Sequence, residues 1–218
     1  MITADKRFQF YGRRKGKSLR RHHSALMDEL LPQLRVAPDN PLAGLGARRW
    51  LEIGFGGGEH LAHQAALHSE VSFIGAEPFV NGVAKLLALV EEANLANVKI
   101  HDHDARPLLE ALPAACFERI YLLYPDPWPK SRHNKRRFVS PETIAHIHRV
   151  LQSDGLFLFA SDIDDYVAWT RAHVSEHGGF VEEGDPSAPY DNWIETRYES
   201  KARREGRGSV YMRFRRKG

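Results

Sequence analysis

Short apolar segments alternate with segments of helical periodicity through most of the chain, and this alternation constrains the fold more than any other feature. Runs of four to six mostly apolar residues predict strands buried on both faces, at 50–55, 71–76, 97–100, 119–123 and 156–160. Apolar residues recur every three or four positions at 59–68 and 79–93, which predicts helices. Alternating strands and helices are typical of an α/β fold with a doubly wound, mostly parallel sheet. Ligands of such sheets bind beyond the carboxyl ends of the strands.

Local signals refine the second half of the chain. Ser140, followed by proline and glutamate, predicts a helix start. Ser161 or Asp162 is expected to cap a further helix. Beyond Gly178 the pattern is irregular until residues 208–216, which predict a final strand.

The composition fits one globular domain with short appendages. The chain has 218 residues, of which 42% are apolar, and this is enough for a sizeable core. A single cysteine, Cys116, excludes an internal disulfide and a thiolate-rich zinc site. No apolar run is long enough to cross a membrane, and the N-terminus has no secretory signal. A cytoplasmic protein is therefore expected.

Basic residues are strongly segregated along the chain. Residues 1–24, 129–137 and 197–218 hold 22 of the 31 Lys and Arg residues, whereas the rest holds 9 basic and 25 acidic residues. Three basic segments around an acidic body favour a polyanionic partner. Solvated tails and a charged loop are the alternative interpretation. Residues 1–24 are expected to form a basic arm that is flexible without that partner, and residues 25–218 the folded domain.

A glycine-rich segment at 51–59, with the sequence LEIGFGGGE, predicts a strand, a tight turn and a helix start. Gly54, Gly56 and Gly58 allow the backbone to turn sharply and to approach a ligand without Cβ clashes. Glu77 follows Gly58 by 19 residues, at the end of the next predicted strand. A carboxylate there can accept hydrogen bonds from both ribose hydroxyls of an adenosine. The segment thus indicates a nucleotide-like cofactor, with a purely structural turn as the alternative.

The charge of this turn separates two classes of cofactor. A dinucleotide-binding oxidoreductase would have glycine at position 59, where this chain has Glu59. Glu52 and Glu59 would also bring negative charge to a turn that should hold a pyrophosphate. S-adenosylmethionine has no phosphate and carries a sulfonium and an ammonium, so the charges favour this methyl donor. Asp104, just after the third predicted strand, is expected near the adenine.

A proline-rich loop, YPDPWPK at 124–130, directly follows the fourth predicted strand. Its prolines stiffen the backbone and exclude helix, so Asp126 is expected to keep one direction. Trp128 offers a ring face worth about 1–3 kcal/mol to a stacked base. The basic run from Lys130 to Arg137 can bind phosphates around a flipped-out nucleotide. A rigid connector without function is the alternative.

Four blocks of the sequence resemble the bacterial tRNA (guanine-N7)-methyltransferase family. They are LEIGFGGGEHL, PDPWPKSRHNKRR, FASDIDDY and IETRYESKARREG, at 51–61, 125–137, 159–166 and 194–206. The basic segment 12–22 also resembles the family's N-terminal arm, so the likeness extends from about residue 10 to the end. It implies methyl transfer from S-adenosylmethionine to N7 of guanine 46 in the variable loop of tRNA.

The resemblance also implies roles for individual residues. Glu52, Glu77 and Asp104 match cofactor-binding acids, and Asp126 matches both a cofactor-pocket residue and the catalytic acid. Substrate-binding positions of the family correspond to Lys130, Asp162, Thr196, Arg197, Tyr198 and Glu199. Arg197 stands where the family usually has lysine, which keeps the charge but changes the hydrogen-bond geometry. From the sequence alone, Thr196 as a helix start and Glu199 as a surface acid remain the alternatives.

Methylation at guanine N7 needs no base, because this nitrogen has a free lone pair. Catalysis should depend on positioning and on a carboxylate, assigned to Asp126, that stabilises charge developing on the purine. No metal is expected: the residues of His101-Asp102-His103-Asp104 alternate between opposite faces of a strand.

Three further functions stay open from the sequence. One is a methyltransferase that acts on another RNA base, a small molecule or a protein. The others are the oxidoreductase and a non-catalytic RNA-binding module, which would not need a glycine turn paired with Glu77. No obligatory protein partner is expected.

Overall fold

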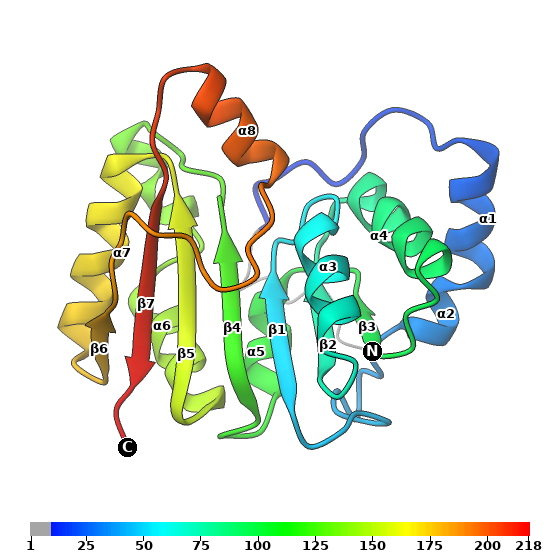
Figure 1. Cartoon of the computed structure of the whole chain (residues 1–218), viewed down its shortest axis with the longest axis horizontal. Coiled ribbons are helices and arrows are strands. Elements are labelled where there is room, and N and C mark those ends of the chain that lie inside the picture. Colours follow the sequence, from blue (N-terminus) through cyan, green and yellow to red (C-terminus); the bar gives the residue numbers. More distant parts are fainter. Residues whose placement is uncertain (1–9) are drawn as a thin grey trace. The chain divides into compact units, whose positions relative to one another are not determined.

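The computed structural model describes residues 10–218, and its elements are labelled in Figure 1. The chain divides into two compact units, Met1–Leu112 and Pro113–Gly218. Each unit combines strands with helices, as the alternating sequence pattern predicts. None of the helices within residues 10–218 is long and apolar enough to cross a membrane.

The first unit holds three parallel strands in the order β3-β2-β1. Figure 1 shows α3 in front of these strands and α5 behind them, so both faces are covered. The predicted strands and both predicted helices are confirmed, whereas α1, α2 and α5 were not predicted. The elements are α1 (Arg21–Glu29), α2 (Leu31–Leu34), β1 (Arg49–Ile53), α3 (Glu59–Leu67), β2 (Ser72–Ala76), α4 (Val80–Glu92), β3 (Val98–His101) and α5 (Ala105–Ala111).

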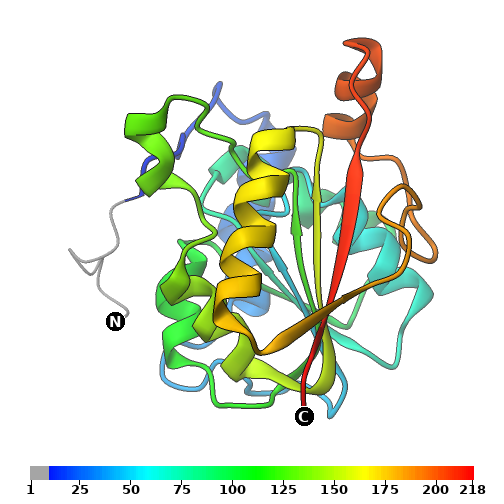
Figure 2. The same ribbon diagram turned by 90° about the vertical axis from the view of Figure 1, so that its left-hand side faces the viewer.

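The second unit holds four strands in the order β4-β5-β7-β6, of which β4 and β5 are parallel and β7 is antiparallel to both neighbours. Helices α6 and α7 pack side by side against β5 (Figure 2). The elements are β4 (Phe117–Leu123), the 3-10 helix η1 (Ser131–Arg136), α6 (Pro141–Val150), β5 (Leu151–Ser161), α7 (Asp164–His177), β6 (Phe180–Glu183), α8 (Arg197–Arg204) and β7 (Val210–Arg216).

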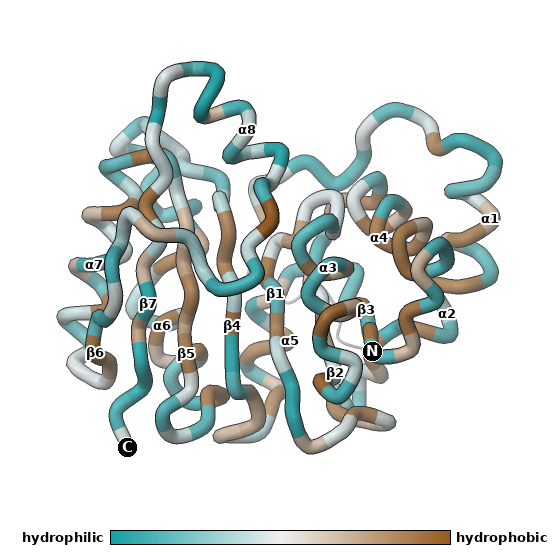
Figure 3. Tube along the Cα trace, in the orientation of Figure 1, coloured by the Kyte–Doolittle hydropathy of each residue, from teal (hydrophilic) through white to brown (hydrophobic). Residues whose placement is uncertain are grey.

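Apolar residues concentrate along the strands of each unit, as Figure 3 shows. Leu51 and Ile74 are fully buried in the first unit, and Phe157 and Phe159 in the second. Burial of such side chains contributes about 1.5–3 kcal/mol each. The continuous apolar runs of the sequence thus mark the core correctly.

Local capping explains where two helices begin. The predicted start at Ser140 is confirmed: its hydroxyl accepts a hydrogen bond from Thr143 N at 3.2 Å, and the Thr143 hydroxyl accepts one from Ser140 N at 2.9 Å. The predicted cap of α7 is wrong, because the residue before this helix is Ile163, without a side-chain cap. Asp162 instead pairs with Arg207.

Strand β6 was not predicted from the sequence, and helix α8 was indicated only by the alternative interpretation of Thr196 as a helix start, which is confirmed. Only Phe180 of β6 is buried, so this edge strand has little apolar signal. Helix α8, RYESKARR, has almost no apolar residues from which to read a period. The final strand, expected at 208–216, is confirmed as β7.

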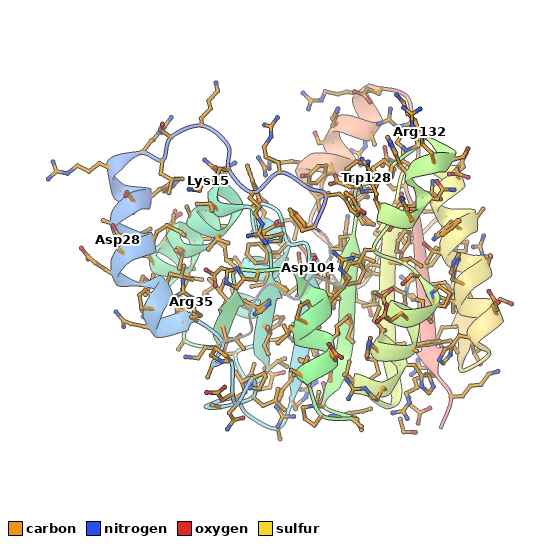
Figure 4. The ribbon with its side chains drawn as sticks, turned by 180° about the vertical axis from the view of Figure 1, so that it is seen from behind. Lys15, Asp28, Arg35, Asp104, Trp128 and Arg132 are labelled. Carbon is orange, nitrogen blue, oxygen red and sulfur yellow. The ribbon has the colours of Figure 1, made fainter. Side chains whose placement is uncertain are left out.

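Part of the predicted basic arm is anchored to the first unit. Asn81, at the start of α4, accepts a hydrogen bond from Gly16 N and donates one to Lys17 O, both at 2.7 Å. Val80 N also donates to Arg14 O at 3.0 Å. Lys15 is exposed on this segment (Figure 4). Residues 1–9 of the arm lie outside the described residues.

Candidate functional site

The glycine turn has the backbone geometry that its sequence predicts. Gly54, Gly56 and Gly58 have φ angles of 71°, 58° and 80°, in the left-handed region that favours glycine. A Cβ on Gly58 would lie 2.7 Å from the Leu86 side chain, because the turn packs closely on α4. The path from β1 into α3 therefore requires glycine here.

Glu77, the predicted ribose acid, is joined to this turn. Its Oε2 accepts a hydrogen bond from Gly56 N at 2.8 Å and its Oε1 accepts one from Phe79 N at 2.9 Å. A carboxylate has about four acceptor positions, so two such bonds leave it able to accept ribose hydroxyls. A Cβ on Gly82 would meet Gly56 O at 2.1 Å, which makes Gly82 a further required glycine.

Glu52 lies in β1 with only 4% of its surface exposed. Its Oε2 is 2.7 Å from His60 Nδ1, and His60 in α3 is equally buried. The sequence pattern did not single out His60. A glutamate and a histidine on either side of the turn, eight residues apart, are the signal that could have found it.

Asp104 caps α5. Its Oδ1 accepts a hydrogen bond from Arg106 N at 2.9 Å, and its carboxylate forms an ion pair with the Arg106 side chain. Its place just past β3 agrees with the sequence prediction (Figure 4). Nowhere in residues 10–218 do three His, Cys, Asp or Glu side chains cluster in a way that could hold a metal.

The donor set of the first unit fits S-adenosylmethionine. The turn has no cationic side chain, and three carboxylates belong to the strand ends of this unit: Glu52 in β1, Glu77 on Gly56 N just after β2, and Asp104 after β3. The group they would hold carries an ammonium, a sulfonium and two ribose hydroxyls, which suit carboxylate acceptors. A pyrophosphate would instead meet like charge at this turn.

The proline-rich loop of the second unit is tightly constrained. Tyr124 and Trp128 have φ angles of 49° and 44°, which cost about 1–3 kcal/mol each in residues other than glycine. Between them, Asp126 makes no hydrogen bond or ion pair with any described residue. The residue is exposed, but the protein around its carboxyl group desolvates it and raises its pKa. The backbone alone therefore sets its direction.

Trp128 contacts the 3-10 helix that follows the loop. The Arg136 guanidinium lies over the indole, 4.9 Å from its centre, and the His133 ring meets it edge-on at 6.0 Å. Figure 4 shows Trp128 and Arg132 at the same end of the second unit. One face of the predicted stacking residue is thus occupied by a cation.

The substrate-binding motif at the start of helix α8 has both exposed and buried side chains. Thr196 caps it, accepting a hydrogen bond from Glu199 N at 3.1 Å. Arg197 and Tyr198 are exposed, and the Tyr198 ring lies nearly parallel to that of Tyr124, with centres 6.4 Å apart. Glu199 points inward and is 7% exposed, so the interpretation as a surface acid is wrong.

Two partners from distant positions hold Glu199. Its Oε1 accepts a hydrogen bond from the Tyr211 hydroxyl at 2.6 Å, and its Oε2 accepts one from Trp193 Nε1 at 2.7 Å. Tyr124 bonds Ser209 nearby at 2.8 Å. No local sequence pattern indicated that Trp193 and Tyr211 belong to this site.

Some of the Lys and Arg side chains that the sequence assigned to a polyanionic partner are instead paired or buried within the protein. Arg213 donates to Pro189 O at 2.7 Å, and Arg215 pairs with Glu183. Arg207 binds Asp162 at 2.7 Å, which raises the pKa of Arg207. These C-terminal cations thus have partners within the second unit. Arg137, predicted to bind phosphate, is 3% exposed, so that prediction is wrong. Lys130, Arg132 and Lys135 are exposed.

The fold is that of class I S-adenosylmethionine-dependent methyltransferases, which confirms the predicted fold class. The 16S rRNA methyltransferase KamB is similar with a TM-score of 0.59 and 16% identity, over 94% of this chain and 99% of that one. The aminoglycoside resistance methyltransferase NpmB1 is similar with a TM-score of 0.54 and 15% identity, over 79% and 89%. At these identities the likeness concerns the fold.

Sequence comparison identifies the family. Residues 47–212 match the family Methyltransf_4, described as "Putative methyltransferase". A tRNA (guanine-N(7)-)-methyltransferase of Agrobacterium fabrum is 52% identical over 94% of both chains, and one of Rhizobium johnstonii is 50% identical over 94% of both. The chain belongs to this family of tRNA (guanine-N(7)-)-methyltransferases. The predicted family and enzyme class are confirmed, and S-adenosylmethionine is confirmed as the cofactor of the family.

Proposed function

We propose that this chain transfers a methyl group from S-adenosylmethionine to N7 of guanine 46 in the variable loop of tRNA. The observation that carries the proposal is the 52% identity, over 94% of both chains, to a relative named for the guanine-N7 reaction. The target position rests on the resemblance of the four sequence blocks. The site residues remain proposals, and their geometry in each unit supports them.

In the first unit, the proposed cofactor residues hold the methyl donor. S-adenosylmethionine supplies an electrophilic methyl carbon on its sulfonium. Glu77 accepts the ribose hydroxyls while Gly56 N keeps its carboxylate oriented. Glu52, one of whose oxygens is held by His60, would accept from the donor's cationic end, and Asp104 would bind on the adenine side. Gly54, Gly56 and Gly58 keep this surface free of side chains.

In the second unit, Asp126 is the proposed catalytic residue. The N7 lone pair would bond to the methyl carbon that the donor supplies, with the thioether as leaving group, so no residue has to remove a proton. The methylated purine would then carry the positive charge that the sulfonium loses. The Asp126 carboxylate accepts hydrogen bonds from the N1/N2 edge of guanine and stabilises this charge. Because its side chain has no internal partner, it is available to the base.

The tRNA backbone is proposed to meet exposed cations. Lys130 and Arg197 lie in the matched motifs, and Arg132 and Lys135 follow Lys130 in the sequence. Each phosphate contact should add roughly 0.7–0.9 to the log–log dependence of affinity on salt. Tyr198 offers an exposed ring to a base, and Thr196, Glu199 and Asp162 orient this surface. Residues 1–24 are proposed to act as a further basic arm in the cytoplasm, without an obligatory protein partner.

The test is the identity of the modified nucleoside. Purified protein is incubated with an unmodified tRNA transcript and methyl-labelled S-adenosylmethionine, and the digested RNA is analysed. Label in 7-methylguanosine, lost when guanine 46 is replaced, is the expected result. Label in another nucleoside would keep the methyltransferase and overturn the assigned base. No label in RNA, despite binding of the donor, would point to a small molecule or protein as substrate.

A further inference from the structure

Arg137 differs from the other cations of its segment in being inside the protein. Its side chain is 0% exposed, whereas Lys130, Arg132 and Lys135 are exposed. A buried guanidinium is costly unless charges and hydrogen bonds compensate it. Its partners therefore indicate what it does.

The partners of Arg137 lie on two elements. On α7, the guanidinium lies between the rings of Tyr166 and Trp169, 5.0 Å from each centre, and pairs with the Asp165 carboxylate. On the proline-rich loop, Arg137 Nε donates to Pro127 O at 2.9 Å. One side chain thus ties the loop to the helix (Figure 2 shows η1 beside the start of α7).

The helix side of this connection is rigid. Tyr166 is fully buried, and its ring packs edge-on against Phe159 of β5 at 5.5 Å. The Tyr166 hydroxyl accepts a hydrogen bond from Phe138 N at 3.1 Å, and Trp169 Nε1 donates to Val139 O at 2.9 Å. The segment next to Arg137 is therefore fixed to α7 independently of the arginine.

The loop side of the connection adjoins Asp126. Pro127 follows Asp126 directly, and Asp126 has no hydrogen bond or ion pair of its own within residues 10–218. Burial raises the pKa of Tyr166 to about 12, and the charge of Asp126 acts in the same direction. The direction of the Asp126 carboxylate depends on the peptide that Arg137 holds.

We propose that Arg137 is a positioning residue, which holds the Pro127 carbonyl against α7 and thereby orients Asp126 for reaction at guanine N7. The proposal rests on the proposed function. A cation that only stabilised the fold would act on stability alone. A positioning cation acts on the rate of methyl transfer while tRNA affinity stays the same.

The decisive variant is Arg137→Lys. Lysine keeps a charge between the two rings but lacks the planar fork that reaches Pro127 O and Asp165 together. We expect the single-turnover rate at saturating tRNA and donor to fall about tenfold, since small misplacements near reacting groups cost this much or more. The KM for tRNA and its salt dependence should stay at their wild-type values. Arg171→Lys, which loses a comparable fork to Glu182 on the same helix, is the matched control with an unchanged rate.

A second readout does not require activity. Hydrogen exchange of the peptide covering residues 124–130 should be faster in Arg137→Lys and unchanged in Arg171→Lys. Asp165→Asn alters only the exposed end of the connection. It should lower the rate and speed the exchange as Arg137→Lys does, but to a smaller extent. This variant tests the proposal if Arg137→Lys does not fold.

Three results would overturn the proposal. The first is that Arg137→Lys has the wild-type rate and the wild-type hydrogen exchange. The second is a loss of rate that disappears at a temperature where both proteins are fully folded. The third is a changed KM for tRNA and a changed salt dependence at constant rate, which would indicate that Arg137 binds phosphate. If the wild-type protein formed no 7-methylguanosine, the proposed function would fail, while the exchange data would still report whether Arg137 holds the loop.

Discussion

The Tyr211 hydroxyl donates a hydrogen bond to the Glu199 carboxylate at 2.6 Å, and this contact joins the first turn of α8 to strand β7. Arg197 and Tyr198 precede Glu199 on the exposed side of the same turn. The motif from Thr196 to Glu199, in which the resemblance implies four substrate-binding residues, therefore contains exposed residues and one buried residue. The buried Glu199 holds the helix turn on which Arg197 and Tyr198 are exposed.

Replacing Glu199 with alanine should weaken both the fold and tRNA binding. The change leaves the partly buried Trp193 donor and the buried Tyr211 donor without this acceptor, which costs about 1–3 kcal/mol. Denaturant unfolding measures the loss of stability, and tRNA binding by filter retention or titration measures the effect on α8. Asp191→Ala removes an exposed acid of the same unit outside this motif and should change neither. Wild-type stability of Glu199→Ala would show that the carboxylate is not an anchor.

Asp126→Asn should lower turnover while donor affinity stays the same. The amide has no charge to stabilise the methylated purine, and loss of one such electrostatic contact costs about a hundredfold or more in rate. The variant should fold at least as well as wild type. Because desolvation raises the pKa of Asp126, its charged form is disfavoured in the folded protein, and the amide removes this cost. Turnover close to wild type would contradict the catalytic role.

The raised pKa of Asp126 also predicts a pH dependence. The anion is the proposed active form, so the single-turnover rate should fall as the pH drops through the pKa of this group. The loss should begin at a higher pH than for an ordinary aspartate, whose pKa is about 3.9. This fall in rate at low pH should be absent from the residual activity of Asp126→Asn and present in Asp191→Asn, which alters an exposed acid of the same unit. If both variants showed the same fall, another group would cause it.

The sequence predicted the described strands other than β6, because buried strands leave continuous apolar runs, and Glu77, Asp104 and Asp126 each stand shortly after one of these runs. It did not predict which charges lie inside. Arg136 and Arg137 are adjacent arginines, yet only Arg137 is buried. The rings of Tyr166 and Trp169, which come from α7, cover its guanidinium. Internal partners that are far apart in the chain leave no local pattern.

Glu77→Gln tests the first unit separately. In the wild type, the two Glu77 oxygens accept from Gly56 N and Phe79 N. Glutamine has one acceptor oxygen, so its amide nitrogen would face one of these donors. Hydrogen bonds to a charged group contribute about 1.5–3 kcal/mol, so donor affinity should fall roughly ten- to a hundredfold by isothermal titration. Glu70→Gln, which alters an exposed acid of the same unit, should bind the donor normally. If Glu77→Gln bound it equally well, the carboxylate would be a support for the turn and not a ligand of the ribose.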